Sequence, residues 1–187
     1  MQSSGVFYGW KIVAVSFLVA AFAWGLGFYG PSIYVNELVR TNGWPVTIVS
    51  GAVTFHFLFS AALVIYLADA YARFGLVATT RAGIVAFGLG AIAWAHAIEP
   101  WQLYPAAALT GIGWAATSGA AVNAFVSPWF LVKRPLALSH AYNGASIGGV
   151  VFTPLWVALI AAIGFKGASI VIAGFGGLLL WLIVGET

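Results

Sequence analysis

The side chain best suited to chemistry in this sequence is His56, which lies near the middle of a long apolar stretch. An imidazole can bind and release a proton close to neutral pH, and its cation can hold an anion. A polar side chain so deep in an apolar segment is costly to bury and usually faces a cavity or a polar neighbour. His56 therefore has two interpretations that stay open: a residue that binds a proton or an anionic solute, or a neutral histidine hydrogen-bonded to a neighbouring helix.

Further polar and aromatic side chains lie inside other apolar stretches and form a second group of candidates. They are Tyr29, Trp114, Asn123, His140, Tyr142 and Asn143. We expect these side chains to line a cavity, with packing or hydrogen bonding between helices as the alternative. No Asp, Glu, Lys or Arg lies in the middle of an apolar stretch, so the sequence offers no fixed charge there to hold a charged ligand.

The sequence contains no set of side chains suited to covalent or metal chemistry. It has no cysteine, and its three histidines are widely separated, which argues against a metal site. No paired carboxylates and no nucleophile with a base converge anywhere. The many glycines lack the preceding strand and the aqueous site that a nucleotide-binding fingerprint needs. We therefore expect no catalytic residue, no metal and no cofactor, and a protein that is not an enzyme.

The composition indicates that these side chains are positioned by a protein whose solvent is lipid. Of the residues, 63% are hydrophobic and only 6% are charged, whereas a soluble domain has about 25% charged residues. Seven Lys and Arg with four Asp and Glu cannot cover a water-exposed surface. The cations are scattered and form no basic patch for nucleic acid. We expect an integral membrane protein with the lipid bilayer as its partner and no nucleic-acid partner.

Charges, prolines and glycine-rich turns divide the chain into six apolar segments, each near the roughly 20 residues that a helix needs to cross a bilayer. They cover residues 12–34, 46–68, 76–98, 101–126, 136–163 and 168–184. Each should be a helix that satisfies its own backbone hydrogen bonds, and short connections make neighbours antiparallel. The sequence thus predicts an all-α membrane protein: a single six-helix domain over residues 1–187, in which two triplets of helices have opposite orientations.

The distribution of Lys and Arg predicts the orientation in the membrane. Two cations, Arg40 and Lys166, fall on one side, and the other side carries Lys11, Arg73, Arg81, Lys133 and Arg134. The side with more cations should be cytoplasmic. Both termini are then expected in the cytoplasm.

Small residues predict where helices approach one another closely. Gly144 and Gly148 have the spacing of a small-xxx-small motif, and Gly149 adjoins it. Pro154 lies within a helical segment, where it removes a backbone hydrogen bond and can kink the helix.

Short motifs occur in a fixed order along essentially the whole chain. They are Tyr8-Gly9-Trp10, Gly43-Trp44, Arg73-Phe74-Gly75, Trp101-Gln102-Leu103-Tyr104, Trp129-Phe130, Lys133-Arg134, Leu136-Ala137-Leu138, Asn143-Gly144-Ala145-Ser146, Gly148-Gly149 and Pro154. This ordered set resembles the N-terminal half of major facilitator superfamily transporters, in particular carriers similar to bacterial monocarboxylate and oxalate/formate transporters.

The resemblance implies a gating loop between the second and third segments. The family has Asp-Arg-x-Gly there, followed by basic residues, and this chain has Ala72 in place of the aspartate. Asp69 and Arg81, one helical turn displaced on either side, are expected to act with Arg73 and Gly75 in this loop. The altered sequence of this loop favours a second hypothesis, in which the protein has lost transport activity.

The resemblance also implies the function. Family members have twelve helices in two halves with the solute held between them, so this chain would pair with a second half, either downstream of Thr187 or on a second copy. We expect secondary transport of a small solute, most consistent with an organic acid anion, by alternating access in a bacterial inner membrane, with proton coupling at His56. The alternative is a membrane-embedded interaction or assembly subunit that keeps the fold and has lost transport.

Overall fold

A computed structural model describes residues 7–186, and every regular element in that range is helical. In chain order the elements are α1 (Tyr8–Gly27), α2 (Gly30–Asn42), α3 (Val46–Val64), α4 (Leu67–Phe74), α5 (Leu76–His96), η1 (Pro100–Gln102), α6 (Leu103–Thr117), α7 (Gly119–Val126), η2 (Ser127–Trp129) and α8 (Arg134–Val184). Four stretches are long and apolar enough to cross a membrane: Tyr8–Asn42, Val46–Val64, Leu76–His96 and Arg134–Val184. The all-helical prediction is confirmed, and these stretches fit a membrane protein.

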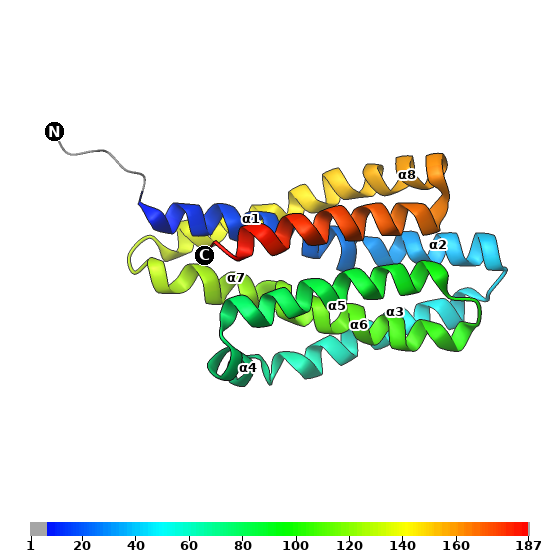
Figure 1. The fold of residues 1–187 in the computed structure, drawn as a ribbon, viewed down its shortest axis with the longest axis horizontal. Coiled ribbons are helices and arrows are strands. Elements are labelled where there is room, and N and C mark those ends of the chain that lie inside the picture. The colour runs from blue at the N-terminus through cyan, green and yellow to red at the C-terminus, as the bar shows by residue number, and fades with distance from the viewer. Residues whose placement is uncertain (1–6, 187) are drawn as a thin grey trace.

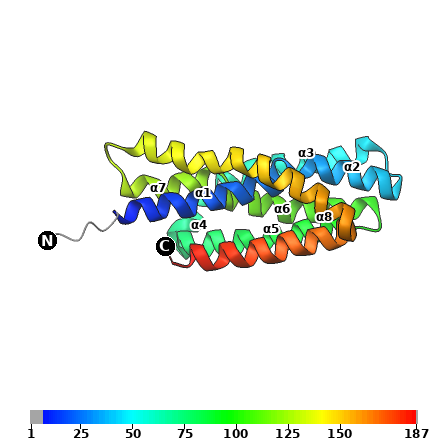
Figure 2. The same cartoon turned by 90° about the horizontal axis from the view of Figure 1, so that it is seen from above.

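The helices run side by side along one long axis in an elongated bundle (Figures 1 and 2). α8 doubles back at Gly164, whose φ of 74° and ψ of 168° interrupt the helix. Its two arms, yellow to orange and orange to red, lie antiparallel (Figure 2). The start of α1 and the end of α8 lie at the same end of the bundle (Figure 1). There the Tyr8 hydroxyl donates a hydrogen bond to the Glu186 carbonyl at 2.8 Å, and Lys11 forms an ion pair with the Glu186 carboxylate at 3.4 Å.

The bounds of three elements differ from the sequence-based expectation. The first apolar segment extends from Tyr8 to Asn42 and is broken between α1 and α2. The second ends at Val64 rather than at residue 68, because the next residues form the short amphipathic helix α4, which exposes Asp69 and buries Leu67. The fourth is divided at Ser118 (φ −85°, ψ −146°), where a serine precedes a glycine, a pair at which helices often kink.

The centre of the bundle depends on close packing between α1 and the first arm of α8. Gly144 and Gly148 face α1: an added Cβ would meet the backbone of Phe17 at the first position and of Ala21 at the second. Such contact between backbones is the use that membrane helices make of glycine at this spacing. It brings α8 close enough for α1 to be covered along much of its length.

The two remaining predicted packing residues lie farther along the same arm of α8. A Cβ added at Gly149 would lie 2.6 Å from Cζ of Tyr29, so this glycine makes room for the tyrosine ring. Pro154 lies inside the helix, which continues through it up to the turn at Gly164.

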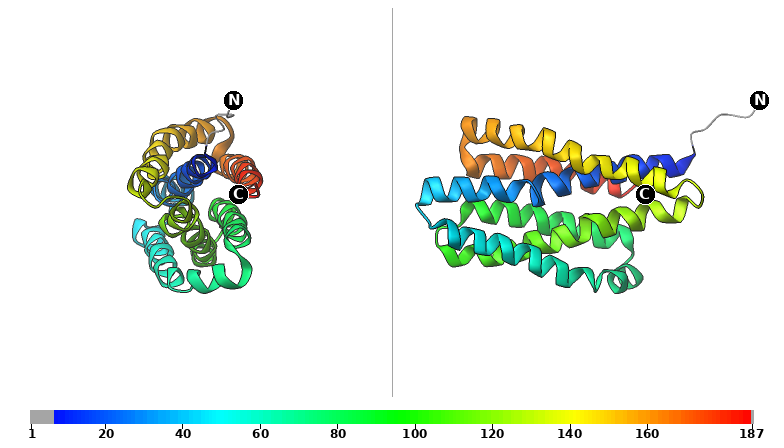
Figure 3. Two further views of the ribbon diagram at one scale, coloured as in Figure 1. Left: turned by 90° about the vertical axis from the view of Figure 1, so that its left-hand side faces the viewer. Right: turned by 180° about the vertical axis from the view of Figure 1, so that it is seen from behind.

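Viewed from the end, the bundle has α6 at its middle and α4 at its edge (Figure 3).

Candidate functional site

His56 lies on α3 at a point where three helices meet, and only 2% of the residue is exposed. Its Nδ1 lies 2.9 Å from Oγ1 of Thr110 on α6. The same Thr110 oxygen accepts a hydrogen bond from Nε1 of Trp94 on α5 at 3.4 Å. One threonine hydroxyl thus joins two buried ring nitrogens from different helices.

The second ring nitrogen of His56 is in a different situation. Nε2 is buried and has no hydrogen-bond partner among the described residues. The contact with Thr110 supplies the neighbour that a neutral structural histidine would need. The unpaired Nε2 supplies the position that a proton-binding histidine would use, so the arrangement accommodates either role.

Glycines bring the three helices close enough for these contacts. A Cβ added at Gly111 would lie 3.1 Å from the His56 carbonyl oxygen, and one added at Gly90 would lie 2.6 Å from the Thr110 amide nitrogen. Larger side chains would force α3 and α5 away from α6. The polar contacts at Thr110 therefore depend on residues that carry no chemistry themselves.

The break between α1 and α2 adjoins the same site. Pro31 has no N–H to donate to the carbonyl of Gly27, four residues earlier. The Tyr29 amide instead donates to the Trp24 carbonyl at 2.9 Å, five residues earlier, which widens this turn. The Ala107 carbonyl of α6 and the Gly27 carbonyl at this break both lie near the His56 imidazole, and neither forms a hydrogen bond with Nε2. An acceptor left without its helical donor is thus placed next to a buried ionisable ring.

Aromatic side chains connect His56 to the surface of the bundle. The Trp114 ring centroid lies 6.4 Å from that of His56, 6.2 Å from that of Phe57 and 4.9 Å from that of Trp24. Phe28 stacks on Trp114 at 6.4 Å and is 53% exposed. Trp114 therefore lies between the buried His56 and the exposed ring of Phe28 at the surface of the bundle.

A polar group lies next to these rings, at the break between α6 and α7. The Tyr142 hydroxyl donates to the Gly119 carbonyl at 2.9 Å and accepts a hydrogen bond from Nδ2 of Asn123 at 2.6 Å. Tyr142 also packs against Trp24 at 6.2 Å. We call Trp24, Phe28, Trp114, Asn123 and Tyr142 the aromatic face.

His140 and Asn143 are placed apart from His56. Both are exposed and line a pocket of about 560 Å³ between α1 and α8, where His140 packs edge-on against Trp10 at 5.9 Å. His140 lies two positions before Tyr142 in the same helix, so its side chain points to a different side of α8. The structure thus brings Trp114 next to His56, joins Asn123 to Tyr142, and places His140 and Asn143 in a separate pocket.

Tyr29 lies at the kink itself. Its ring contacts Phe28 at 5.2 Å and fits against Gly149 of α8. It therefore links the kink to the arm of α8 that carries Tyr142.

The four residues expected in the gating loop do not form one network. Asp69 and Arg73 lie on exposed positions of α4, and the ion pairs within residues 7–186, Lys11–Glu186 and Arg40–Glu37, include neither of them. Gly75 ends α4 with a φ of 84°. Burial raises the pKa of Tyr71, also on α4, to about 12, so this phenol stays neutral where it packs near α6.

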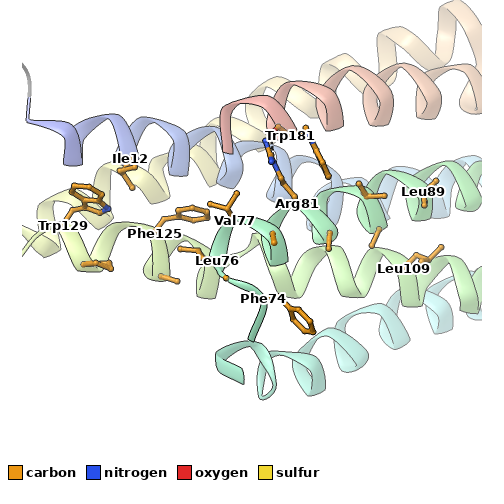
Figure 4. Close-up of a pocket in the computed structure, with 17 residues that line it drawn as sticks. Ile12, Phe74, Leu76, Val77, Arg81, Leu89, Leu109, Phe125, Trp129 and Trp181 are labelled. Carbon is orange, nitrogen blue, oxygen red and sulfur yellow. Dashed lines mark hydrogen bonds between the residues drawn. The ribbon is translucent and has the colours of Figure 1, made fainter. Parts of the chain in front are cut away.

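Arg81 binds to α8 instead of to the loop. Its Nε donates to the Trp181 carbonyl at 3.1 Å, and its guanidinium lies 4.8 Å from the centre of the Trp181 ring. A cation at the carboxyl end of a helix is favourable because carbonyl groups there lack partners. Arg81 also lines a pocket of about 950 Å³, together with Gly75 (Figure 4).

Thr110 and Trp94 were not among the residues singled out from the sequence. A threonine in an apolar helix usually hydrogen-bonds its own backbone, as Thr110 does to the carbonyl of Ala107 at 3.1 Å, so its type carries no signal. Within the described residues no group of three or more His, Asp or Glu lies close enough to hold a metal ion.

No protein-family model matches this chain, and no curated protein is similar to it. The resemblance to major facilitator transporters therefore remains a prediction from the motifs.

Proposed function

We propose that this chain is one half of a proton-coupled secondary transporter for a small organic acid anion. The observation that carries the proposal is the juxtaposition of a buried histidine with an unpaired ring nitrogen and a helix break whose freed carbonyl lies beside it. Transporters of several folds build their sites near the bilayer midplane from discontinuous helices, whose unpaired backbone groups bind ions or substrates. His56 and Gly27 supply the two groups that a proton site needs, a base and an acceptor.

The proposed topology has six spans with both termini in the cytoplasm. The first span is α1 together with α2, the second is α3 and the third is α5. The fourth is α6 together with α7, and the two arms of α8 are the fifth and sixth. The contacts of Tyr8 and Lys11 with Glu186 support placing the two ends on one side. The bacterial inner membrane is proposed from the family resemblance alone.

The aromatic face is the proposed contact with the solute and with a second half. It combines rings with hydrogen-bonding groups from α1, α6, α7 and α8, and part of it is exposed. A solute held there would lie between this bundle and a second six-helix bundle, supplied downstream of Thr187 or by another copy. Because the aromatic face carries no fixed cation, the charge that binds the anion would come from that second half.

The test is proton movement coupled to uptake by the natural gene product in proteoliposomes. Small monocarboxylates and dicarboxylates are added outside, and a trapped pH-sensitive dye reports protons that enter with them. We expect His56→Gln to abolish acidification while the protein remains folded. His140→Gln is the matched control, since this histidine lies in the separate pocket, and it should leave acidification unchanged.

Each outcome separates the two interpretations of His56. Acidification by the His56→Gln variant at the wild-type rate would identify His56 as a packing residue and remove the proton-coupling proposal. Equal losses in both histidine variants would point to a general defect in assembly rather than to a proton site.

One observation favours the alternative, a membrane-embedded interaction subunit. Asp69 and Arg73 are exposed on α4 and form no ion pair with each other, although the resemblance predicts a gating loop there. A subunit that no longer moves would not need such a gating loop. This reading predicts that the folded natural protein moves neither protons nor any of the acids tested, and coupled uptake of one of them would contradict it.

A further inference from the structure

The pocket that contains Arg81 does not include His56 in its lining and has a distinct character. Its volume is about 950 Å³, and it opens between α5, α7 and the end of α8 (Figure 4). Among the described residues that line it, Arg81 is the one charged side chain, and nearly all the others are apolar. The pocket therefore combines a single cation with a long apolar wall.

The cation and the apolar wall follow one another along α5. Arg81, Val85 and Leu89 are spaced by four residues and lie on one face of the helix. At about 1.5 Å per residue, Leu89 lies roughly 12 Å farther along the helix axis than Arg81. Val85 is 46% and Leu89 55% exposed, and Leu109 of α6 borders the same pocket. Apolar surface of this kind is suited to hydrocarbon chains.

Two tryptophans line the part of the pocket that lies away from Leu89. Arg81 packs on Trp181 at 4.8 Å, and Trp129, which is 40% exposed, lies farther along, beyond Val77 and Phe125 (Figure 4). Tryptophan rings are enriched where membrane proteins meet lipid headgroups. The order along the pocket is thus the order of a phospholipid, with the headgroup level near Arg81 and the acyl chains toward Leu89.

Arg81 keeps a net positive charge in this position. Its contact with the Trp181 carbonyl is to a dipole and not to a carboxylate, and neither ion pair in the described part of the chain includes it. A guanidinium whose remaining N–H groups are not hydrogen-bonded can bind phosphate oxygens through charge-assisted hydrogen bonds. Basic pockets between membrane helices on the cytoplasmic side bind acidic lipid headgroups in the same way.

We propose that this pocket binds one anionic phospholipid, with its phosphate at Arg81 and an acyl chain along Val85, Leu89 and Leu109. The occupant is a lipid rather than a water-soluble anion because the pocket's wall beyond Arg81 is apolar over its whole length. The proposal rests on the membrane character of the helices and not on transport.

Native mass spectrometry of the natural gene product in non-ionic detergent tests the site. The protein is titrated with phosphatidylglycerol and with phosphatidylcholine of the same acyl chains. We expect phosphatidylglycerol to bind at least about 5-fold more tightly, since one cation near the membrane surface contributes that much. Arg81→Gln should remove this preference, and Arg81→Lys should keep most of it. Arg73→Gln is the control for charge, because Arg73 does not line the pocket.

A second pair of variants tests the apolar wall without altering Arg81. Ala82→Trp fills the pocket and should weaken the binding of both lipids, whereas Leu178→Trp, at an exposed position of α8 outside it, should not. Unchanged phosphatidylglycerol affinity in both Arg81→Gln and Ala82→Trp would overturn the proposal. Displacement of the lipid by inorganic phosphate alone would also overturn it, because the site would then hold a soluble anion.

Discussion

At the scale of single residues, Thr110 is the position on which the buried site depends. Its hydroxyl oxygen contacts ring nitrogens of His56 and Trp94, all in a region closed to water. Thr110→Val keeps the shape and removes the oxygen, which leaves both nitrogens without their shared partner. A buried polar group without a partner costs about 1–3 kcal/mol. We expect this loss in the free energy of unfolding, measured by tryptophan fluorescence in mixed detergent micelles.

The control for Thr110 keeps the oxygen. Thr110→Ser loses only a methyl group and should cost less, about 1 kcal/mol. A double variant with His56→Leu should be less destabilised than the sum of the single variants, because the removed partners belonged to each other. Equal stability of Thr110→Val and the wild type would show that the hydroxyl makes no net contribution.

Residue types predicted some members of the site and not others. His56 stood out because a histidine is rare in the middle of an apolar segment, and the structure places it in a buried contact between helices. Thr110 did not, since threonine is an ordinary residue of such helices. His140 and Asn143 are as polar as His56 but lie in another pocket, because the side of a helix that a residue faces depends on packing between helices.

At the scale of elements, the glycines of α8 determine how closely it packs on α1. Gly148→Ala would place a Cβ against the backbone of Ala21, where neither helix can yield without moving. Overpacking of this kind costs about 1–3 kcal/mol. Gly174→Ala is the matched control on the second arm, because nothing lies within 4 Å of its added Cβ. It should be neutral or stabilising by up to about 1 kcal/mol, since alanine favours a helix more than glycine does.

The same unfolding measurement compares the two glycine variants. If Gly148→Ala and Gly174→Ala changed stability in the same direction and by the same amount, the close approach of α1 and α8 would not contribute to the fold.

The elements were predictable to the extent that hydrophobicity determines them. Most residues of each apolar segment are helical, although several segments are interrupted or run past the end of a helix, and the turn at Gly164 separates the last two. The break at Ser118 was not predicted, because hydrophobicity alone does not mark it. Pro31 removes a helical hydrogen bond at the break between α1 and α2, but the neighbour of the Gly27 carbonyl comes from α3, and no local pattern shows it.

At the scale of the whole molecule, the exposed side chains indicate how the bundle lies in the membrane. Large apolar side chains are exposed along most of its length, including Leu58 at 68% and Val150 at 72%. A water-soluble protein of this size would not expose so much apolar surface. The cations gather toward the end that carries Arg81 and the connection between α7 and α8, and this end is the proposed cytoplasmic side.

The absence of cysteine from the sequence makes this orientation directly testable. Val132 lies in the connection from α7 to α8 and is 92% exposed, and Asn42 ends α2 at the opposite end of the bundle (Figure 1). Val132→Cys should react with a membrane-impermeant maleimide only in inverted membrane vesicles, and Asn42→Cys only in intact spheroplasts. Leu58→Cys, exposed halfway along α3, should react in neither, since lipid would cover it. Labelling of all three from both sides would exclude a spanning bundle, whereas the reverse of the first two results would place both termini outside and exchange the leaflet that faces Arg81.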